Sequence, residues 1–259
     1  PVGIVLSGGL NVLFSDWREA FWVGVVPITI AVLVLIFLKE SKNETVEKAG
    51  NSPIKALFKV ENRLKLLVGS IVYGFDLVGL WAIFSWIPTW VDSLLSNDES
   101  SGQMRGISMM LLGMGGMVGT GLSGFLVNRL GLRRTLLSNF IGTLVLCLLL
   151  FLSTREFSTL VMVQIAILAL FFGISQGALT VYITELFPKE MRATGTGFCF
   201  NIGRVFTTSA VFFVGSLVAG LGGYANAMLV FSSAFVVAWI ALYFDKNTPK
   251  LHSETTAKS

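Results

Sequence analysis

Long, continuous apolar segments constrain the fold of this chain more than any other feature of its sequence. A helix needs about 20 mostly apolar residues to cross the hydrocarbon core of a bilayer. Seven segments meet that requirement, approximately at residues 21–38, 66–91, 106–127, 135–152, 158–184, 193–220 and 224–244. Residues 1–14 look like the last part of one further span. We therefore expect a chain that crosses a membrane several times.

These spans should be helices. Only 13% of the residues are charged, whereas soluble domains carry about 25%. Helices and closed barrels are the structures that satisfy every backbone polar group in lipid. The apolar segments are continuous rather than alternating, which argues against the strands of a membrane barrel. The sequence thus predicts an all-α membrane protein.

Glycines gather within several spans, most densely in "GMGGMVGTGLSG" at residues 113–124. Small residues allow membrane helices to approach closely. Two interpretations stay open at each position: a contact with a neighbouring helix, or a glycine that the helix simply tolerates.

The chain begins at Pro1, inside an apolar segment, so we expect the N-terminal part of the protein to be missing. Cys147 and Cys199 lie within predicted spans, and His252, the one histidine, lies in the polar tail. Buried cysteines of this kind behave as small apolar residues. We therefore expect no disulfide, no metal site and no cofactor.

Positive charge alternates from one connecting segment to the next. Lys and Arg gather at 39–65, 129–134, 185–194 and 245–259, whereas the connections between these are acidic or carry little charge. Short cytoplasmic loops are enriched in Lys and Arg. The pattern predicts that these segments, including the C-terminus, are cytoplasmic, and the net charge of +4 follows from this topology rather than from a nucleic-acid surface.

The connection "GFLVNRLGLRRT" at residues 124–135 contains a specific pattern. It reads G-x-x-x-N-R-x-G-x-R-R, formed by Gly124, Asn128, Arg129, Gly131, Arg133 and Arg134. Gly131 permits a tight turn. Asn128 is a residue type that bonds free N–H groups at the start of a helix.

This pattern resembles the loop G-x-x-x-D-R-x-G-R-R between the eighth and ninth helices of the major facilitator superfamily, with Asn128 in place of the usual Asp and Leu132 in place of the first Arg of the pair. The stretch "ELFPKEMRATGTGF", with Glu185, Pro188, Arg192 and Gly195, is similar to the E-x-x-P-x-x-x-R-x-x-G loop between helices ten and eleven of its sugar-porter-like and organic-acid-symporter-like branches. The stretch "SDWREAFWVGVVP" resembles the entry to the sixth helix.

The resemblance implies a partial superfamily fold, from the end of helix five to helix twelve. Residues 1–38 would end the N-terminal bundle, 39–65 would be a cytoplasmic linker, 66–244 would form the C-terminal six-helix bundle, and 245–259 would be a cytoplasmic tail. The lipid bilayer and the missing N-terminal half would be partners. Transporters of this type alternate between inward-open and outward-open forms by rocking one half against the other.

The resemblance also implies a cytoplasmic charge network that closes the inner side. Its members would be Arg129, Arg133 and Arg134, with Glu185 and Glu190 as partners. The alternative is that these charges only set the orientation and solubility of the loops.

Two charges lie deep within predicted spans. Asp76 lies about 16 Å from Lys65, and Arg204 about 18 Å from Arg192, at the helical rise of about 1.5 Å per residue. Both depths are near the midplane of a core about 30 Å thick. Charges there are costly and face a cavity or a partner, so an Asp76–Arg204 pair is geometrically feasible.

We interpret Arg204 as the group that recognises an anionic substrate, because its planar fork suits a carboxylate. Asp76 would be its counter-ion or would carry a proton. The alternative is a structural ion pair that stabilises helix contacts. Further candidates for the cavity are Tyr73, Trp81, Trp86, Gln176, Tyr182 and Asn201.

These observations favour a secondary active transporter of a small organic solute, with proton-coupled symport of an organic acid ahead of a sugar. The chain lacks the seventh-helix glutamines and the "PETKG" typical of sugar porters. A membrane-embedded enzyme is disfavoured because no predicted span contains a histidine. A non-transporting membrane protein on the same scaffold remains an alternative, and no phosphate-binding loop for ATP is present.

Overall fold

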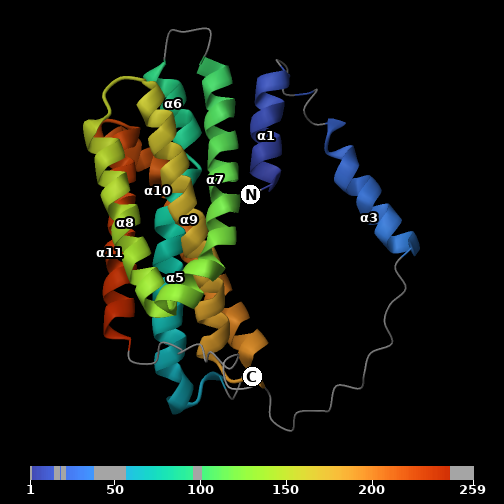
Figure 1. Cartoon of the computed structure of the whole chain (residues 1–259), viewed down its shortest axis with the longest axis vertical. Coiled ribbons are helices and arrows are strands. Elements are labelled where there is room, and N and C mark those ends of the chain that lie inside the picture. Colours follow the sequence, from blue (N-terminus) through green and yellow to red (C-terminus); the bar gives the residue numbers. More distant parts are fainter. Residues whose placement is uncertain (1, 15–17, 19–21, 38–56, 96–100, 246–259) are drawn as a thin grey trace.

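The computed structural model describes residues 2–14, 18, 22–37, 57–95 and 101–245. Within these residues the regular secondary structure is helical, without strands. The main helices are α1 (Val2–Leu13), α3 (Val25–Phe37), α5 (Val60–Phe84), α6 (Ile87–Leu94), α7 (Ser101–Leu130), α8 (Leu132–Ser153), α9 (Thr159–Leu186), α10 (Arg192–Leu221) and α11 (Tyr224–Phe244). Figure 1 shows α5 to α11 gathered in one bundle, α1 beside α7, and α3 standing apart. The all-α prediction is confirmed.

Six helical segments in the described chain are long and apolar enough to cross a membrane. They cover residues 60–94, 101–130, 132–153, 159–186, 192–221 and 224–244, and each corresponds to one predicted span. The seventh predicted span, 21–38, contains the 13 residues of α3 and adjoins residues outside the described ranges.

The span from 60 to 94 is interrupted, although the sequence predicted a continuous segment at 66–91. Helix α5 ends at Phe84 and α6 begins at Ile87. Pro88 explains the break, because proline has no N–H to bond the carbonyl of Phe84 four residues earlier and its ring clashes with that carbonyl. The span therefore continues as a separate short helix.

The predicted linker, 39–65, lies only partly within the described residues. Residues 38–56 fall outside them, and α5 already begins at Val60. The first turns of α5 are polar, so hydropathy alone placed the start of this helix too late.

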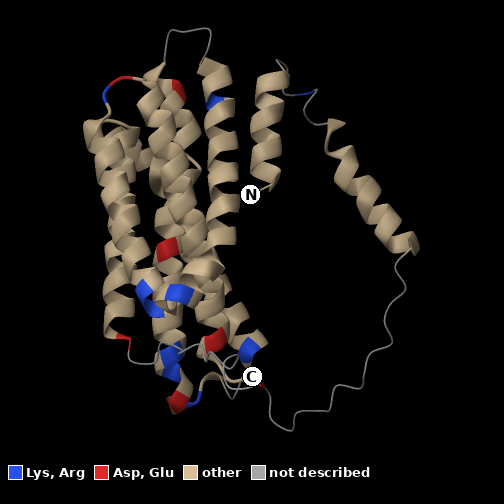
Figure 2. Ribbon diagram, in the orientation of Figure 1, with Lys and Arg blue, Asp and Glu red and all other residues tan. Residues whose placement is uncertain are grey.

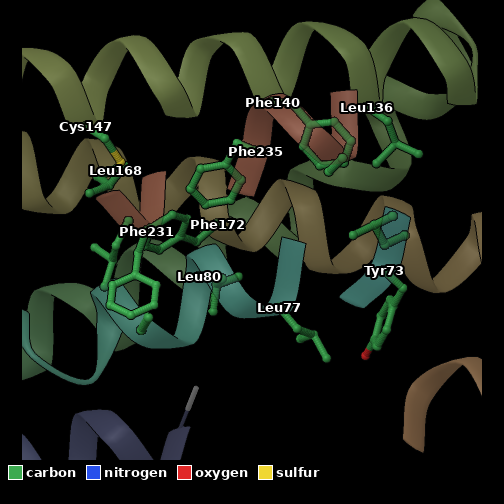
Figure 3. Close-up of a cluster of buried hydrophobic side chains, with 14 of the residues drawn as sticks. Tyr73, Leu77, Leu80, Leu136, Phe140, Cys147, Leu168, Phe172, Phe231 and Phe235 are labelled. Atoms are coloured by element: carbon green, nitrogen blue, oxygen red, sulfur yellow. The ribbon is translucent and has the colours of Figure 1, made fainter. Parts of the chain in front are cut away.

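Aromatic and aliphatic side chains fill the space between α5, α8, α9 and α11 (Figure 3). Phe172 of α9 lies between two other rings, with centroids 6.0 Å from Phe84 and 6.1 Å from Phe235. Phe140 and Cys147 of α8 are fully buried in the same cluster. Lipid is as apolar as these side chains, so close van der Waals packing stabilises the bundle.

Helices α7 and α9 approach each other at glycines. A Cβ atom at Gly119 would lie 2.0 Å from the carbonyl oxygen of Leu170, and one at Gly173 would lie 2.2 Å from that of Gly116. Thr120 Oγ1 donates to the carbonyls of Gly116 (2.9 Å) and Gly173 (3.2 Å), one on each helix. The predicted close approach within residues 113–124 is confirmed for Gly119.

Helix α1 packs on α7 in the same manner, because a Cβ atom at Gly8 would lie 2.6 Å from the carbonyl oxygen of Gly106.

Helices α10 and α3 are poorly buried among the described residues. Only 17% of the most apolar segment of α10 is buried, compared with 67% for the span 60–94. Helix α3 has no buried residue among those described. Much apolar surface of α3 and α10 therefore has no contact with the other described residues.

Candidate functional site

Asp76 lies on α5 and is completely buried. Two consecutive residues of α9 donate hydrogen bonds to its carboxyl group. Ser175 Oγ donates to Oδ1 at 2.5 Å, and Gln176 Nε2 donates to Oδ2 at 3.0 Å. An acidic group at membrane depth is costly unless such partners are present, so these bonds fix both the position and the environment of the carboxyl.

A cavity of about 730 Å³ lies next to this cluster. Its walls come from α1, α5, α7 and α9, and most of its lining is apolar, including Trp81, Phe84 and Phe172. Gln176 lines the cavity as well as bonding to Asp76. The carboxyl group is therefore connected to the cavity through a single amide side chain.

Uncharged polar groups complete the cavity wall. Thr120, Ser123 and Thr180 line it together with Gln176. The hydroxyls of Thr120, Ser123 and Thr180 donate to backbone carbonyls of α7 and α9. The amide of Gln176 is thus the side chain best placed to respond to a bound solute.

The structure does not join Asp76 to Arg204 among the described residues, although the sequence made this pair feasible. Asp76 faces α9, whereas Arg204 is an exposed residue of α10 and does not line the cavity. Figure 2 shows that charged residues gather mainly toward the ends of the bundle. The side chain of Arg204 is exposed on α10.

Tyr73 connects the neighbourhoods of these two charges. It lies one turn from Asp76 on α5 and stacks on Phe200 with 4.5 Å between ring centroids. Phe200 and Arg204 are four residues apart and share one face of α10. A Cβ atom at Gly203 would lie 2.9 Å from Tyr73 Cδ1, so this glycine provides space for the ring.

The other predicted cavity residues separate into two groups. Trp81 lines the cavity. Asn201 is exposed, and its amide donates to the carbonyl of Gly197 in its own helix at 2.7 Å. Trp86 stacks on Tyr224 at 5.7 Å and does not line this cavity.

Tyr182, which was also predicted as a cavity group, does not line this cavity either. Its side chain is fully buried, and its hydroxyl donates to Asp245 Oδ2 at 2.8 Å. Asp245 directly follows α11 and is itself almost completely buried. The bond joins α9 to the end of α11, a contact that no sequence pattern indicated.

The turn between α7 and α8 has the backbone expected of it. Gly131 has φ +86°, a conformation that favours glycine, and it separates two helices directly. Asn128 does not bond to the start of α8, because that helix end has no side-chain cap. The suggested capping role of Asn128 is therefore wrong.

Arg129 and Arg133 of this turn contact groups other than Glu185 and Glu190, which the sequence suggested as their partners. Arg133 Nη2 donates to the backbone carbonyl of Tyr243 at 2.5 Å, and Arg129 lies 5.6 Å from the ring of Phe125. Glu185 instead forms an ion pair with Arg192 at 3.1 Å, on the segment that contains Pro188. Gly124, Arg134 and Glu190 are exposed.

Comparison with known proteins agrees with this architecture. The sequence model of the Major Facilitator Superfamily matches residues 1–209. The chain belongs to this superfamily. As a member of it, the chain with its six apolar segments is a multi-pass membrane protein.

Curated superfamily relatives include transporters of organic acids. The cis,cis-muconate transport protein of Acinetobacter baylyi is 26% identical over 92% of this chain and 59% of its own length. The 3-(3-hydroxy-phenyl)propionate transporter of Escherichia coli is 28% identical over 94% of this chain and 60% of its own length. The chain thus spans less than two thirds of these superfamily members.

A solved structure shows the same fold. The superfamily transporter FucP in the outward conformation superposes with a TM-score of 0.64 at 12% identity, covering 88% of this chain and 54% of that protein. At this identity the likeness concerns the fold alone.

Proposed function

We propose that this chain is the C-terminal part of a secondary active transporter that moves a small organic acid by alternating access. The relatives that transport muconate and hydroxyphenylpropionate support an unsaturated or aromatic carboxylate as the solute. The aromatic cavity wall of Trp81, Phe84 and Phe172 suits the carbon skeleton of such a compound. Residues N-terminal to this chain would supply the other half of the pathway.

The observation that carries the proposal is the bond between Asp76 and Gln176. Asp76 is a buried carboxyl in a membrane span, and Gln176 extends from it to the cavity. A buried carboxyl group is suited to take up and release a proton. In this proposal a solute that contacts Gln176 alters the environment of Asp76, which couples solute binding to proton movement.

In this proposal Arg204 recognises the carboxylate of the solute outside the cavity lining, on the part of the pathway that α10 would share with the other half of the transporter. It is exposed on α10, the span with the least burial in the described chain. An Arg guanidinium forms two parallel hydrogen bonds with a carboxylate. Tyr73, one turn from Asp76 on α5, stacks on Phe200, one turn from Arg204 on α10.

A neutral solute is the second candidate. The charged side chains of the described residues do not line the cavity, whose polar groups are amide and hydroxyl. Such groups also bind a sugar. Transport of a neutral solute would leave Arg204 with a structural role.

We further propose that the α7–α8 turn, the α9–α10 connection and the C-terminus face the cytoplasm. The alternation of Lys and Arg between connections supports this orientation. Arg134 is exposed at the α7–α8 turn, so an Arg134→Cys variant places a reactive thiol there. In intact cells it should react with a membrane-impermeant maleimide only after the membrane is made permeable.

Uptake into proteoliposomes containing the full-length protein tests the function. Radiolabelled cis,cis-muconate and 3-(3-hydroxyphenyl)propionate are compared with arabinose, with and without an inward proton gradient. The proposal predicts carboxylate uptake that a proton ionophore abolishes. Uptake of arabinose but not of the carboxylates would favour the neutral-solute candidate instead.

A further inference from the structure

A second hollow lies between α5 and α10, separate from the cavity. This α5–α10 groove has a volume of about 640 Å³ and shares no lining residue with the cavity. Its lining includes Arg63, Leu67, Ile71, Phe75, Phe198 and Phe206. Apart from Arg63, its polar contribution is Ser70, whose hydroxyl donates to Cys199 Sγ at 3.6 Å. The groove is thus an apolar surface with one cation.

The groove has the length of one lipid leaflet. Arg63 and Phe75 are twelve residues apart on α5, which corresponds to about 18 Å at 1.5 Å per residue. Half of a hydrocarbon core about 30 Å thick is about 15 Å. Leu67 is 58% exposed and Phe206 59% exposed, so the apolar walls are open along this length.

Arg63 is oriented at one end of the groove. Its Nε donates to the carbonyl of Phe58 at 2.9 Å, and no described residue bonds to its terminal nitrogens. The guanidinium therefore presents free N–H groups in a fixed direction, the arrangement that suits a phosphate. Residues 59–65 contain three cations and one carboxylate, so this end is positive.

We propose that the α5–α10 groove binds an anionic phospholipid, with one acyl chain along Leu67 and Phe206 and the phosphate at Arg63. The cation at one end and the apolar walls of leaflet length match the two parts of such a lipid. An apolar helix such as α3, which has no charged residue, would leave this cation without a partner.

Native mass spectrometry of the full-length protein in detergent tests this site. Phosphatidylglycerol and phosphatidylcholine with identical acyl chains are titrated against the protein. One basic residue contributes about fivefold in affinity for an anionic lipid. Arg63→Gln should therefore weaken phosphatidylglycerol binding about fivefold without changing phosphatidylcholine binding. Arg105→Gln, at an exposed arginine of α7, should change neither.

A second variant tests the acyl-chain part of the groove. Leu67→Trp fills the groove and should reduce binding of both lipids, whereas Leu149→Trp, at a 54% exposed position of α8, should not. Unchanged phosphatidylglycerol binding in both groove variants would overturn the proposal. Detection of a dimer that does not depend on lipid and that Leu67→Trp abolishes would also overturn it, because a second copy of the chain would then occupy the groove. If Arg63→Gln fails to fold, equal affinity of the unmodified protein for the two lipids overturns it.

Discussion

Gln176 donates a hydrogen bond to Asp76 Oδ2 at 3.0 Å and also lines the cavity. One side chain therefore contacts both the buried acid and the space in which we propose that the solute binds. Binding of the solute and a change in the protonation of Asp76 would then both affect the amide of Gln176. This relationship gives a mutational test that involves only residues of the described chain.

Gln176→Leu should reduce uptake at least tenfold and lower the free energy of unfolding by about 1–3 kcal/mol. The substitution removes one of two donors and leaves a buried carboxylate oxygen without a partner. Uptake and the thermal unfolding midpoint in detergent are measured together. Gln164→Leu is the matched control, because Gln164 lies on the same helix and outside the cavity lining. Equal effects of the two changes would contradict a specific role for Gln176.

Gly173→Ala should destabilise the protein by about 1–3 kcal/mol, the usual cost of overpacking. The new Cβ atom would lie 2.2 Å from the carbonyl oxygen of Gly116, and backbone atoms cannot yield as a flexible side chain does. Gly215→Ala meets nothing within 4 Å and should be neutral or stabilising. Thermal unfolding of both variants would show a clear difference, and equal midpoints would contradict the close α7–α9 contact.

Tyr182→Phe should cost about 1–2 kcal/mol of stability. The change removes the hydroxyl that donates to the buried Asp245 carboxylate, and hydrogen bonds within membrane bundles contribute about this much at most. Tyr243→Phe is the control, since Tyr243 is 50% exposed. An unchanged unfolding midpoint for Tyr182→Phe would show that the bond to Asp245 does not stabilise the end of α11.

The sequence predicted the helices well, because membrane spans depend on local composition. Each of the six long apolar segments follows from its own hydropathy, and Gly131 marks the turn between two of them. The break before α6 was missed, although Pro88 was a visible signal for it. The start of α5 at Val60 was missed because polar residues extend a helix beyond the apolar core.

The candidate site was predicted less completely, because it depends on which helices are neighbours. Asp76 stood out as a charged residue within a span. Asp76 and Arg204 were predicted at similar depths in the membrane, but depth does not determine the direction in which either side chain points. The actual donors come from α9, and Ser175 was not considered. Its position beside Gln176, directly after the apolar stretch at residues 165–174, was the available signal. The Tyr182–Asp245 bond needed knowledge of how α9 and α11 pack.

The most direct test of the account is carboxylate uptake by Arg204→Gln in the full-length protein, at a membrane level equal to that of the unmodified protein. Hydrogen bonds to a charged group contribute about 1.5–3 kcal/mol, so we predict loss of uptake by at least tenfold. Arg105→Gln, which also removes an exposed arginine, should transport normally. Undiminished carboxylate uptake by Arg204→Gln would contradict the proposal that this arginine recognises the solute.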